Sequence, residues 1–319
     1  MLKEPLMITL TRPEIEALLD FSDATNAIEQ AYILTSKGQV NIPPVGHITF
    51  ADEADCHIKY GHMEGDENFV IKIATGFPKN DEQGLPNGNG ALLVLSAQTG
   101  ALKALLHDEM YLTNVRTGIG GAIASQKLAR AHSKNILIVG TGVQARMQIE
   151  AHAKIFSNPL SFSVWGRDMN KAQNVVSDMA AFDVTYASSL ETAAAAADII
   201  VTTTASTTPF LMSDWVKAGT HITAIGADAP GKQELETKLI ARANCLYVDL
   251  KSQCVDHGEF ATAIKENSIS SGDLIELGTV LSEADQLARS STDITIADLT
   301  GIAAQDIAIA NSILNKVRE

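Results

Sequence analysis

Hydrophobic and polar residues follow two different patterns along the 319-residue chain. From Asp55 to about Leu106, apolar residues alternate with polar ones, as is typical of half-buried β-strands. The strand-like segments 56–63 and 69–74 flank a turn at 64–68, and the segments 91–96 and 101–106 flank a turn at 97–100. This arrangement predicts two antiparallel hairpins.

From about Val115 to Asp298, short apolar runs alternate with stretches of helical periodicity, which is typical of a parallel sheet with crossover helices. The expected strands are Ile136–Val139, Phe162–Trp165, Ile199–Thr203, Ile222–Ile225 and Leu246–Asp249. Two long helices are expected at about 113–129 and 301–317. We therefore expect a continuous α/β domain, residues 118–299. A discontinuous α+β domain is expected from residues 1–117 plus 300–319.

Composition excludes several classes of function. The net charge is −14 and no basic cluster is present, which argues against a nucleic-acid or anionic-membrane partner. The longest apolar runs, such as Ala193–Val201, are far shorter than the ~20 residues that cross a bilayer. The N-terminal segment has acids and a proline where a signal peptide needs an apolar core, so a cytoplasmic location is expected.

Cysteine and histidine usage gives no sign of a metal site. The three cysteines are scattered without a CxxC motif, and the eight histidines show neither HxH nor HxxxH spacing. We expect neither a disulfide framework nor a bound metal.

A glycine-rich turn follows the first strand of the α/β region. The stretch ILIVGTGVQA places Gly140, Thr141, Gly142, Val143, Gln144 and Ala145 between an apolar strand and an amphipathic helix. The first glycine allows a tight turn, the second lets a pyrophosphate approach the backbone, and the alanine lets the helix pack on the strand. The context predicts a Rossmann-type dinucleotide-binding domain. Thr203, at the end of a neighbouring strand, is expected to contact the same cofactor.

The end of the next strand bears on the type of cofactor. NAD sites usually place an acid there, whereas NADP sites have a small residue and an arginine for the 2′-phosphate. Gly166 and Arg167 fit the second pattern, and Asp168 follows one position later. NADP(H) is therefore favoured and NAD(H) stays open.

Three charged residues are candidates for chemistry. Lys72 shares a strand face with Val70 and Ala74, so it needs either an anionic ligand or a structural ion pair. Arg116 lies early in a predicted helix. It binds either the carboxylate of a ligand or, in a salt bridge, one of the chain's own acids. Asp228 follows a predicted parallel strand, where ligands bind, although Asp before Ala-Pro-Gly is also an ordinary turn residue.

These residues lie in blocks that resemble the ornithine cyclodeaminase/μ-crystallin family. The matching blocks are VIKIATGFPKN, LVLSAQTGALKALLHDEMYLTNVRTGIGGAIASQKLA, ILIVGTGVQARMQIEAH, DWVKAGTHITAIGADAPGKQEL and TGIAAQDIAIA, in the family's order. The resemblance implies that the discontinuous domain, residues 1–117 plus 300–319, binds the substrate and forms a homodimer. It also implies hydride exchange between nicotinamide and the α-carbon of a small amino or imino acid.

The resemblance also implies roles for individual residues. Lys72 and Arg116 would bind the substrate α-carboxylate, and Asp228 would face the substrate nitrogen. Thr113 and the pair Thr300 and Gly301 would contact the nicotinamide end of the cofactor.

Departures from the family pattern bear on the reaction. The stretch PPVGHITF lacks the arginine that many members have there, and Lys59 stands where cyclodeaminases have an acid. Lys59 is a candidate carboxylate ligand but cannot serve as that acid. We therefore expect a reductase of a cyclic ketimine such as Δ1-pyrroline-2-carboxylate, forming L-proline. The alternative is an NAD-dependent ornithine cyclodeaminase, and a third possibility is a non-catalytic NADPH-binding protein.

Overall fold

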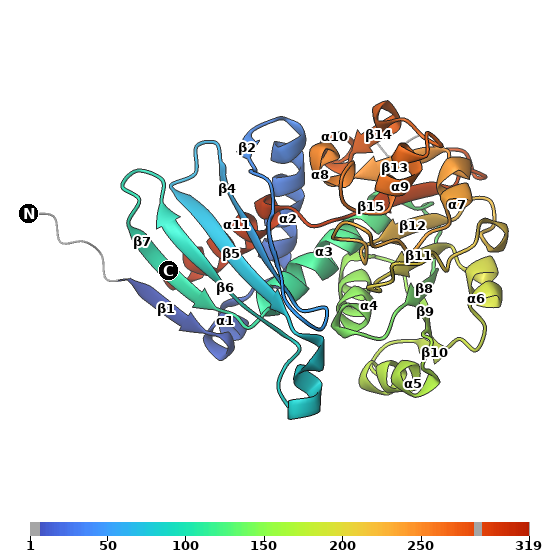
Figure 1. Ribbon diagram of the computed structural model, residues 1–319, viewed down its shortest axis with the longest axis horizontal. Helices are drawn as coiled ribbons and strands as arrows, with labels where there is room; N and C mark the ends of the chain where they lie inside the picture. The colour runs from blue at the N-terminus through green and yellow to red at the C-terminus, as the bar shows by residue number, and fades with distance from the viewer. Residues whose placement is uncertain (1–6, 284–288, 319) are drawn as a thin grey trace, which may run out of the picture. The chain divides into compact units, whose positions relative to one another are not determined.

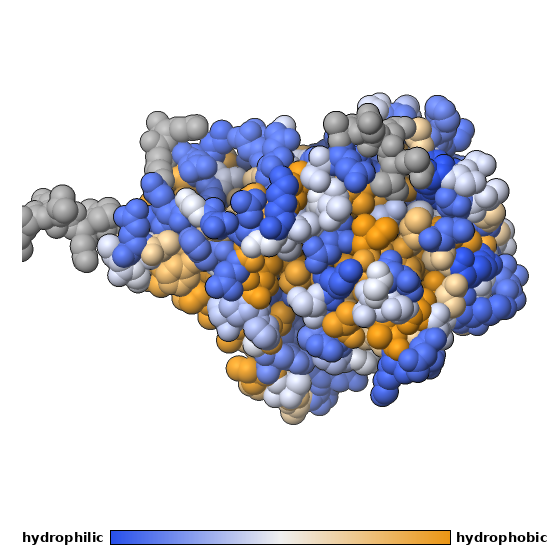
Figure 2. All heavy atoms as spheres, turned by 90° about the horizontal axis from the view of Figure 1, so that it is seen from above, coloured by the Kyte–Doolittle hydropathy of each residue, from blue (hydrophilic) through white to orange (hydrophobic). Residues whose placement is uncertain are grey.

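The computed structural model describes residues 7–283 and 289–318, and the chain divides into two compact units. Unit 1 comprises residues 1–116 and 302–319, and unit 2 comprises residues 117–301. Among the described residues, no helix is long and apolar enough to cross a membrane. In the view of Figure 2, polar residues cover most of the visible surface and apolar residues gather in smaller patches.

A mostly antiparallel sheet forms the centre of unit 1 (Figure 1). Its strands run in the order β1-β7-β6-β5-β4-β2, and β3 also pairs with β4. The bounds are β1 Ile8–Thr11, β2 Val40–Asn41, β3 Gly46–Thr49, β4 Asp55–Met63, β5 Asn68–Gly76, β6 Gly88–Ser96 and β7 Leu102–His107. The two predicted hairpins, β4–β5 and β6–β7, are confirmed. They are joined through β5 and β6 into one sheet.

Helices cover one face of this sheet. The helices of unit 1 are α1 Arg12–Leu18, α2 Phe21–Ser36, the first part of α3 Tyr111–Leu128, and α11 Ala303–Arg318, with a 3-10 turn η1 at Pro78–Gln83. Helix α11 packs on α2 and on strands β4 and β5. Proline near the start of α1 and Asp20 at the N-cap of α2 set where these helices begin.

The two faces of the sheet differ in what they carry. Cross-strand register places Lys59, Lys72, Leu92 and Leu106 in one row, and all four are buried. The next row along the strands, on the opposite face, holds Tyr60, Ile71, Leu93 and Leu105, which are exposed or partly exposed. Two lysines therefore enter the buried side of the sheet, while the outer side is apolar.

Unit 2 contains an eight-stranded parallel sheet in the order β10-β9-β8-β11-β12-β15-β13-β14. The strands are β8 Asn135–Val139, β9 Ser161–Trp165, β10 Val184–Tyr186, β11 Ile199–Thr202, β12 His221–Ala224, β13 Cys245–Val248, β14 Leu274–Glu276 and β15 Thr295–Asp298. The helices are α4 Val143–Ile155, α5 Met169–Asp178, α6 Leu190–Ala196, α7 Thr237–Arg242, α8 Lys251–Cys254, α9 Phe260–Lys265 and α10 Leu277–Leu281, with 3-10 turns η2 Ser213–Trp215 and η3 Ser271–Asp273. The five predicted strands of this sheet are confirmed.

The topology of unit 2 is that of a Rossmann-type sheet. The strand order reverses between β8 and β11, which is where open parallel sheets bind ligands at their carboxyl ends. The glycine-rich remainder of α3 packs closely on α4: a Cβ at Gly118 would lie 2.9 Å from the Met147 carbonyl oxygen. A larger residue at this position would push the two helices apart.

Candidate active site

Unit 1 brings two of the predicted cations onto one carboxylate. Lys72 on β5 has its Nζ 2.9 Å and 2.8 Å from the two carboxylate oxygens of Asp306 on α11. Arg116 on α3 donates from Nε to Asp306 Oδ1 at 3.1 Å. All three side chains are buried. Lys72 and Arg116, 44 positions apart in the sequence, are thus held by one acid from the last helix.

Lys59 adds a third positive charge to this cluster. It lies opposite Lys72 in the β4–β5 pairing and is buried on the same face of the sheet. Its charge lowers the pKa of both Lys72 and Asp306. A second buried carboxylate, Asp108, also interacts with Lys72, so three cations lie near two acids.

The pKa values of Lys72 and Asp306 reflect burial and the neighbouring charges together. Burial, and then repulsion from Arg116, lower the pKa of Lys72 to about 7, although Asp306 acts in the opposite direction. Burial alone would raise the pKa of Asp306, but attraction to Lys72 and Arg116 outweighs it and the pKa lies below its usual value. An anion that reaches Lys72 would find it half protonated near neutral pH and would favour the charged form.

Sequence reasoning missed Asp306 and its neighbour Gln305. Gln305 Oε1 accepts from Arg116 Nη1 at 3.3 Å, and Gln305 Nε2 donates to the Tyr32 hydroxyl at 2.9 Å. A signal was present, because Asp306 falls on the apolar stripe of α11, four residues after Ile302 and three before Ile309. An acid on a buried helix face needs a cationic partner. Thr113 is buried one turn before Arg116 in α3.

In unit 2 the predicted glycine turn joins β8 to α4 at the point where the strand order reverses. Gly140 has φ +133°, and a Cβ there would lie 2.3 Å from the Thr203 hydroxyl oxygen. Thr203 itself donates to the Val139 carbonyl at 3.2 Å. Gly140 is therefore required by both its backbone conformation and its close approach to Thr203.

The start of α4 fits an anionic group. Gly142 is the N-cap, no side chain caps the helix, and a Cβ at Gly142 would meet nothing within 4 Å. Val143 is exposed, whereas Ala145 is fully buried against the sheet. The first backbone N–H groups of α4 thus face open space beside a residue without a side chain, which suits a pyrophosphate. Gln144, the next residue, lies on the partly buried side of the same turn.

The adjacent turn after β9 presents Arg167 to solvent. Gly166 precedes it, and a Cβ at Gly166 would lie 2.4 Å from Thr141 Cγ2, so glycine lets the two turns come together. Asp168 caps α5 by accepting from the N–H groups of Asn170 and Lys171 at 2.9 Å and 3.2 Å. The carboxylate is thus used to begin α5, while the guanidinium beside it points away from the core.

Asp228 lies in the loop that follows β12. Its Oδ1 is 2.6 Å from Lys232 Nζ, and 39% of its side chain is exposed. Asp228 thus has the position expected of a ligand-facing residue and the ion pair expected of a turn residue. Thr300 and Gly301 bond to Asp249, from the Thr300 hydroxyl at 3.1 Å and the Gly301 N–H at 2.6 Å, which fixes the turn after β15.

A buried acid that the sequence did not reveal organises the loops at the carboxyl ends of β11 and β12. Glu234 accepts from the N–H groups of Thr204 at 2.6 Å and Gly226 at 3.0 Å. Burial raises the pKa of Glu234 to about 7. A Cβ at Gly226 would lie 2.0 Å from the Thr204 carbonyl, so glycine permits this close loop contact.

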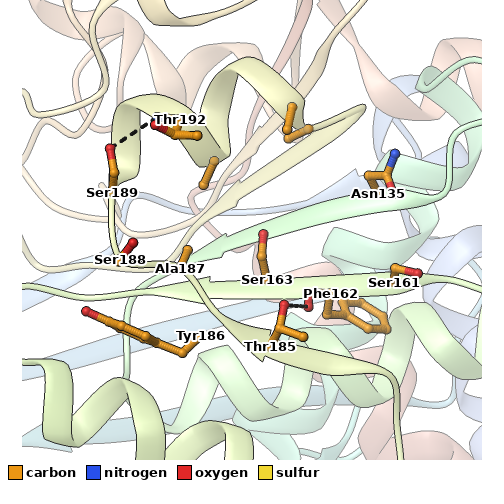
Figure 3. A pocket seen from close by; sticks show the side chains of 13 residues that line it. Asn135, Ser161, Phe162, Ser163, Thr185, Tyr186, Ala187, Ser188, Ser189 and Thr192 are labelled. Atoms are coloured by element: carbon orange, nitrogen blue, oxygen red, sulfur yellow. Dashed lines mark hydrogen bonds between the residues drawn. The ribbon is translucent and has the colours of Figure 1, made fainter.

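A separate hollow of about 460 Å³ lies beneath α6 along β9 and β10. Figure 3 shows its lining, in which the hydroxyls of Ser163 and Thr185 and the ring of Tyr186 are prominent. The Thr185 hydroxyl donates to the Phe162 carbonyl at 3.2 Å. The residues of the Gly140–Ala145 turn are not part of this lining, so the hollow is distinct from the candidate dinucleotide site.

Comparison with known proteins gives the same picture along the whole chain. The sequence model of the ornithine cyclodeaminase/mu-crystallin family matches residues 4–319. An uncharacterized cyclodeaminase of Sinorhizobium fredii is 36% identical over 99% of this chain and 97% of its own length. A Δ1-pyrroline-2-carboxylate reductase of Bacillus cereus is 33% identical over 80% of this chain and 79% of its own length.

A solved structure extends the likeness to three dimensions. An archaeal alanine dehydrogenase, solved as a dimer with bound NAD, matches with a TM-score of 0.88 and 31% identity, covering 98% of this chain and 96% of the other. By name these relatives include a cyclodeaminase and two oxidoreductases, and the alanine dehydrogenase structure holds NAD. The chain is an enzyme that belongs to the ornithine cyclodeaminase/mu-crystallin family.

Proposed function

We propose that this enzyme is an NAD(P)H-dependent reductase of the C=N bond at the α-carbon of a small imino acid, with Δ1-pyrroline-2-carboxylate as substrate and L-proline as product. The observation that carries the proposal is the buried set Lys59, Lys72 and Arg116, three cations that outnumber the two buried carboxylates beside them, Asp306 and Asp108. Such a charge excess suits an anionic substrate. The Bacillus cereus relative that bears this activity in its name supports the choice of ring.

In unit 1 the cations bind and orient the substrate carboxylate. Arg116 offers a planar guanidinium suited to bidentate binding, and Lys72 offers a compact charge beside it. Asp306 and Gln305 hold Arg116 in position before substrate arrives, which reduces the ordering required on binding. The substrate carboxylate stabilises the protonated form of Lys72. Its binding fixes the position of the adjacent α-carbon.

In unit 2 the turn Gly140–Gln144 holds the cofactor pyrophosphate on the N-terminus of α4. Arg167 binds the 2′-phosphate, so the preferred cofactor is NADP(H). When bound, NADPH would supply a hydride for the α-carbon. Asp228 leaves its ion pair with Lys232 and hydrogen-bonds the protonated imine nitrogen. When hydride adds to the α-carbon, the C=N π electrons pass to this nitrogen, which keeps its proton and becomes the amine. The walls around the cofactor include Thr113, Thr203, Thr300 and Gly301.

The outer face of the unit 1 sheet supports a homodimer. The row Tyr60, Ile71, Leu93 and Leu105 is apolar across four strands, and Ile73 in the adjacent row is 37% exposed. An apolar sheet face of this kind is typical of a surface that another subunit covers.

One experiment separates the candidate functions. Purified enzyme is incubated with Δ1-pyrroline-2-carboxylate and NADPH, and in parallel with L-ornithine and NAD⁺, and proline and ammonia are measured. Proline formed with consumption of NADPH supports the proposal, whereas proline and ammonia from ornithine, without consumption of NADPH in the first mixture, would establish the cyclodeaminase. Asp228→Asn tests the third possibility. If the protein only binds the cofactor, this variant should still bind NADPH and there is no turnover for it to lose.

A further inference from the structure

Two histidines and an aspartate, His47, Asp55 and His57, converge on one face of strands β3 and β4. His47 lies directly opposite His57 in the antiparallel pairing. Asp55 comes two residues before His57 on β4, so its side chain leaves the same face of the sheet. The sequence spacing predicted no metal site, because the pairing of β3 with β4 is what brings His47 to the other two residues.

The ligand-type atoms of these three residues point to a common centre. Asp55 Oδ2 is 3.8 Å from His47 Nε2 and 3.6 Å from His57 Nε2, and all three atoms lie within 4.8 Å of one another. The two imidazole rings stand edge to face with centroids 4.5 Å apart. Both rings therefore direct a nitrogen toward the same carboxylate oxygen.

These separations fit ligands around an ion better than direct hydrogen bonds. A hydrogen bond from a ring nitrogen to a carboxylate oxygen would bring the two atoms to about 2.7–2.9 Å. A zinc ion with bonds of about 2.0–2.2 Å places neighbouring tetrahedral ligand atoms about 3.3–3.5 Å apart. The distances of 3.6 Å and 3.8 Å need only a small contraction to reach that arrangement.

The surrounding backbone leaves room for the cluster. On β5, Ala74 lies opposite His57 and Gly76 lies opposite Asp55. A Cβ at Gly76 would stand 2.9 Å from Asp55 Oδ1, so glycine preserves the place of the carboxylate. The side chains are 33%, 31% and 14% exposed for His47, Asp55 and His57, which leaves a coordination position open to solvent.

We infer that His47, Asp55 and His57 form a binding site for a divalent transition-metal ion, with Zn²⁺ as the representative probe. Two imidazoles and one carboxylate are a ligand set typical of such ions, and three protein ligands with one open position are typical of sites where the metal meets a small molecule. Lys59 follows His57 by two residues on the same strand face, about 6.6 Å along β4, so the ion would lie next to the buried cations.

The test is calorimetric titration of tag-free, chelator-treated enzyme with ZnCl₂. The control is His62→Ala, because His62 lies on the other face of β4 and contacts the Asp66 carbonyl through Nε2 at 3.0 Å. We expect one Zn²⁺ per chain in the native protein and in His62→Ala, and a loss of affinity of about 10–100-fold or more in His47→Ala and His57→Ala. Asp55→Asn, which keeps the shape of the side chain, should also weaken binding.

Two results would overturn the inference. One is the absence of stoichiometric Zn²⁺ binding to the native protein, and the other is binding that the three ligand variants leave unchanged. Circular dichroism of each variant verifies that it is folded, and Asp55→Asn keeps the test decisive if an alanine variant fails to fold. The titration requires no substrate, so its result is independent of the proposed reductase activity.

Discussion

Lys72 is a charged residue buried at the centre of unit 1. Strand alternation in the sequence placed it on the face of Val70 and Ala74, and the structure confirms that Val70 and Lys72 are buried together. Which anion it meets was not predictable, because Asp306 lies 234 positions away and reaches it through the packing of α11 on β5. The structural ion pair is therefore present, and the excess of cations around it is compatible with a ligand as well.

Protonation of Lys72 should govern how the enzyme responds to pH. Its pKa of about 7 means that the cation predominates below neutral pH and is lost as the pH rises. If the cation binds the substrate carboxylate, kcat/KM should decline above pH 7 by up to about tenfold per unit. Steady-state kinetics across pH 6–9 tests this, and Lys72→Arg, which stays charged, should remove the decline. A decline of the same shape in Lys72→Arg would assign it to another group.

Asp306 should be important for stability, since it is the carboxylate that offsets buried cations. Asp306→Asn leaves Lys72 and Arg116 buried without that charge, and such changes cost about 3–5 kcal/mol. Urea unfolding followed by circular dichroism measures the effect. Glu16→Gln is the control, because it removes an exposed ion pair with Arg12 and should cost less than about 1 kcal/mol. Equal costs for the two variants would show that the buried network adds no special stability.

At the scale of elements, the hairpins and the Rossmann-type turn were predictable because their patterns are local. Strands β4 to β7 alternate over six to nine residues, and glycines at 140 and 142 follow an apolar strand. Strands β1, β2, β3, β10, β14 and β15 were not predicted. They are two to four residues long, and pairing with neighbouring strands stabilises them more than their own composition does. Missing β3 also hid the approach of His47 to His57.

The two glycines of the cofactor turn should respond differently to alanine. At Gly142 the added methyl has space and an ordinary φ, so Gly142→Ala should fold normally and weaken NADPH binding by about tenfold or more by blocking close approach to the pyrophosphate. At Gly140 the methyl meets the Thr203 hydroxyl and the φ is unfavourable, so Gly140→Ala should lose stability as well. Fluorescence titration and thermal melting separate these effects. Unchanged affinity in Gly142→Ala would place the cofactor elsewhere.

At the scale of the whole molecule, the assembly should depend on the outer face of the unit 1 sheet. Ile73→Lys places a charge on this face and should convert a dimer into monomers, as measured by light scattering after size-exclusion chromatography. Leu85→Lys is the control, because Leu85 is 54% exposed but lies outside the sheet, in the connection after η1. A native protein that is already monomeric, or a dimer that survives Ile73→Lys, would contradict this interface.

Part of the candidate site was accessible from the sequence, and part was not. The strand and helix patterns and the family blocks identified Lys72, Arg116 and the glycine turn, since each lies inside a recognisable local motif. Asp306, Gln305 and Glu234 act through contacts between segments distant in the chain, which periodicity does not encode. The choice between ring sizes depends on the shape of a pocket, and no local pattern specifies such a shape.

In the proposed function, the buried cations of unit 1 bind the substrate carboxylate. The most direct measurement is kcat/KM for Δ1-pyrroline-2-carboxylate with NADPH in the native enzyme and in Lys72→Met, together with the Kd of NADPH for both. We expect kcat/KM to fall by about 100-fold or more and the Kd of NADPH to stay within about twofold. Retention of kcat/KM in Lys72→Met would contradict the proposed function.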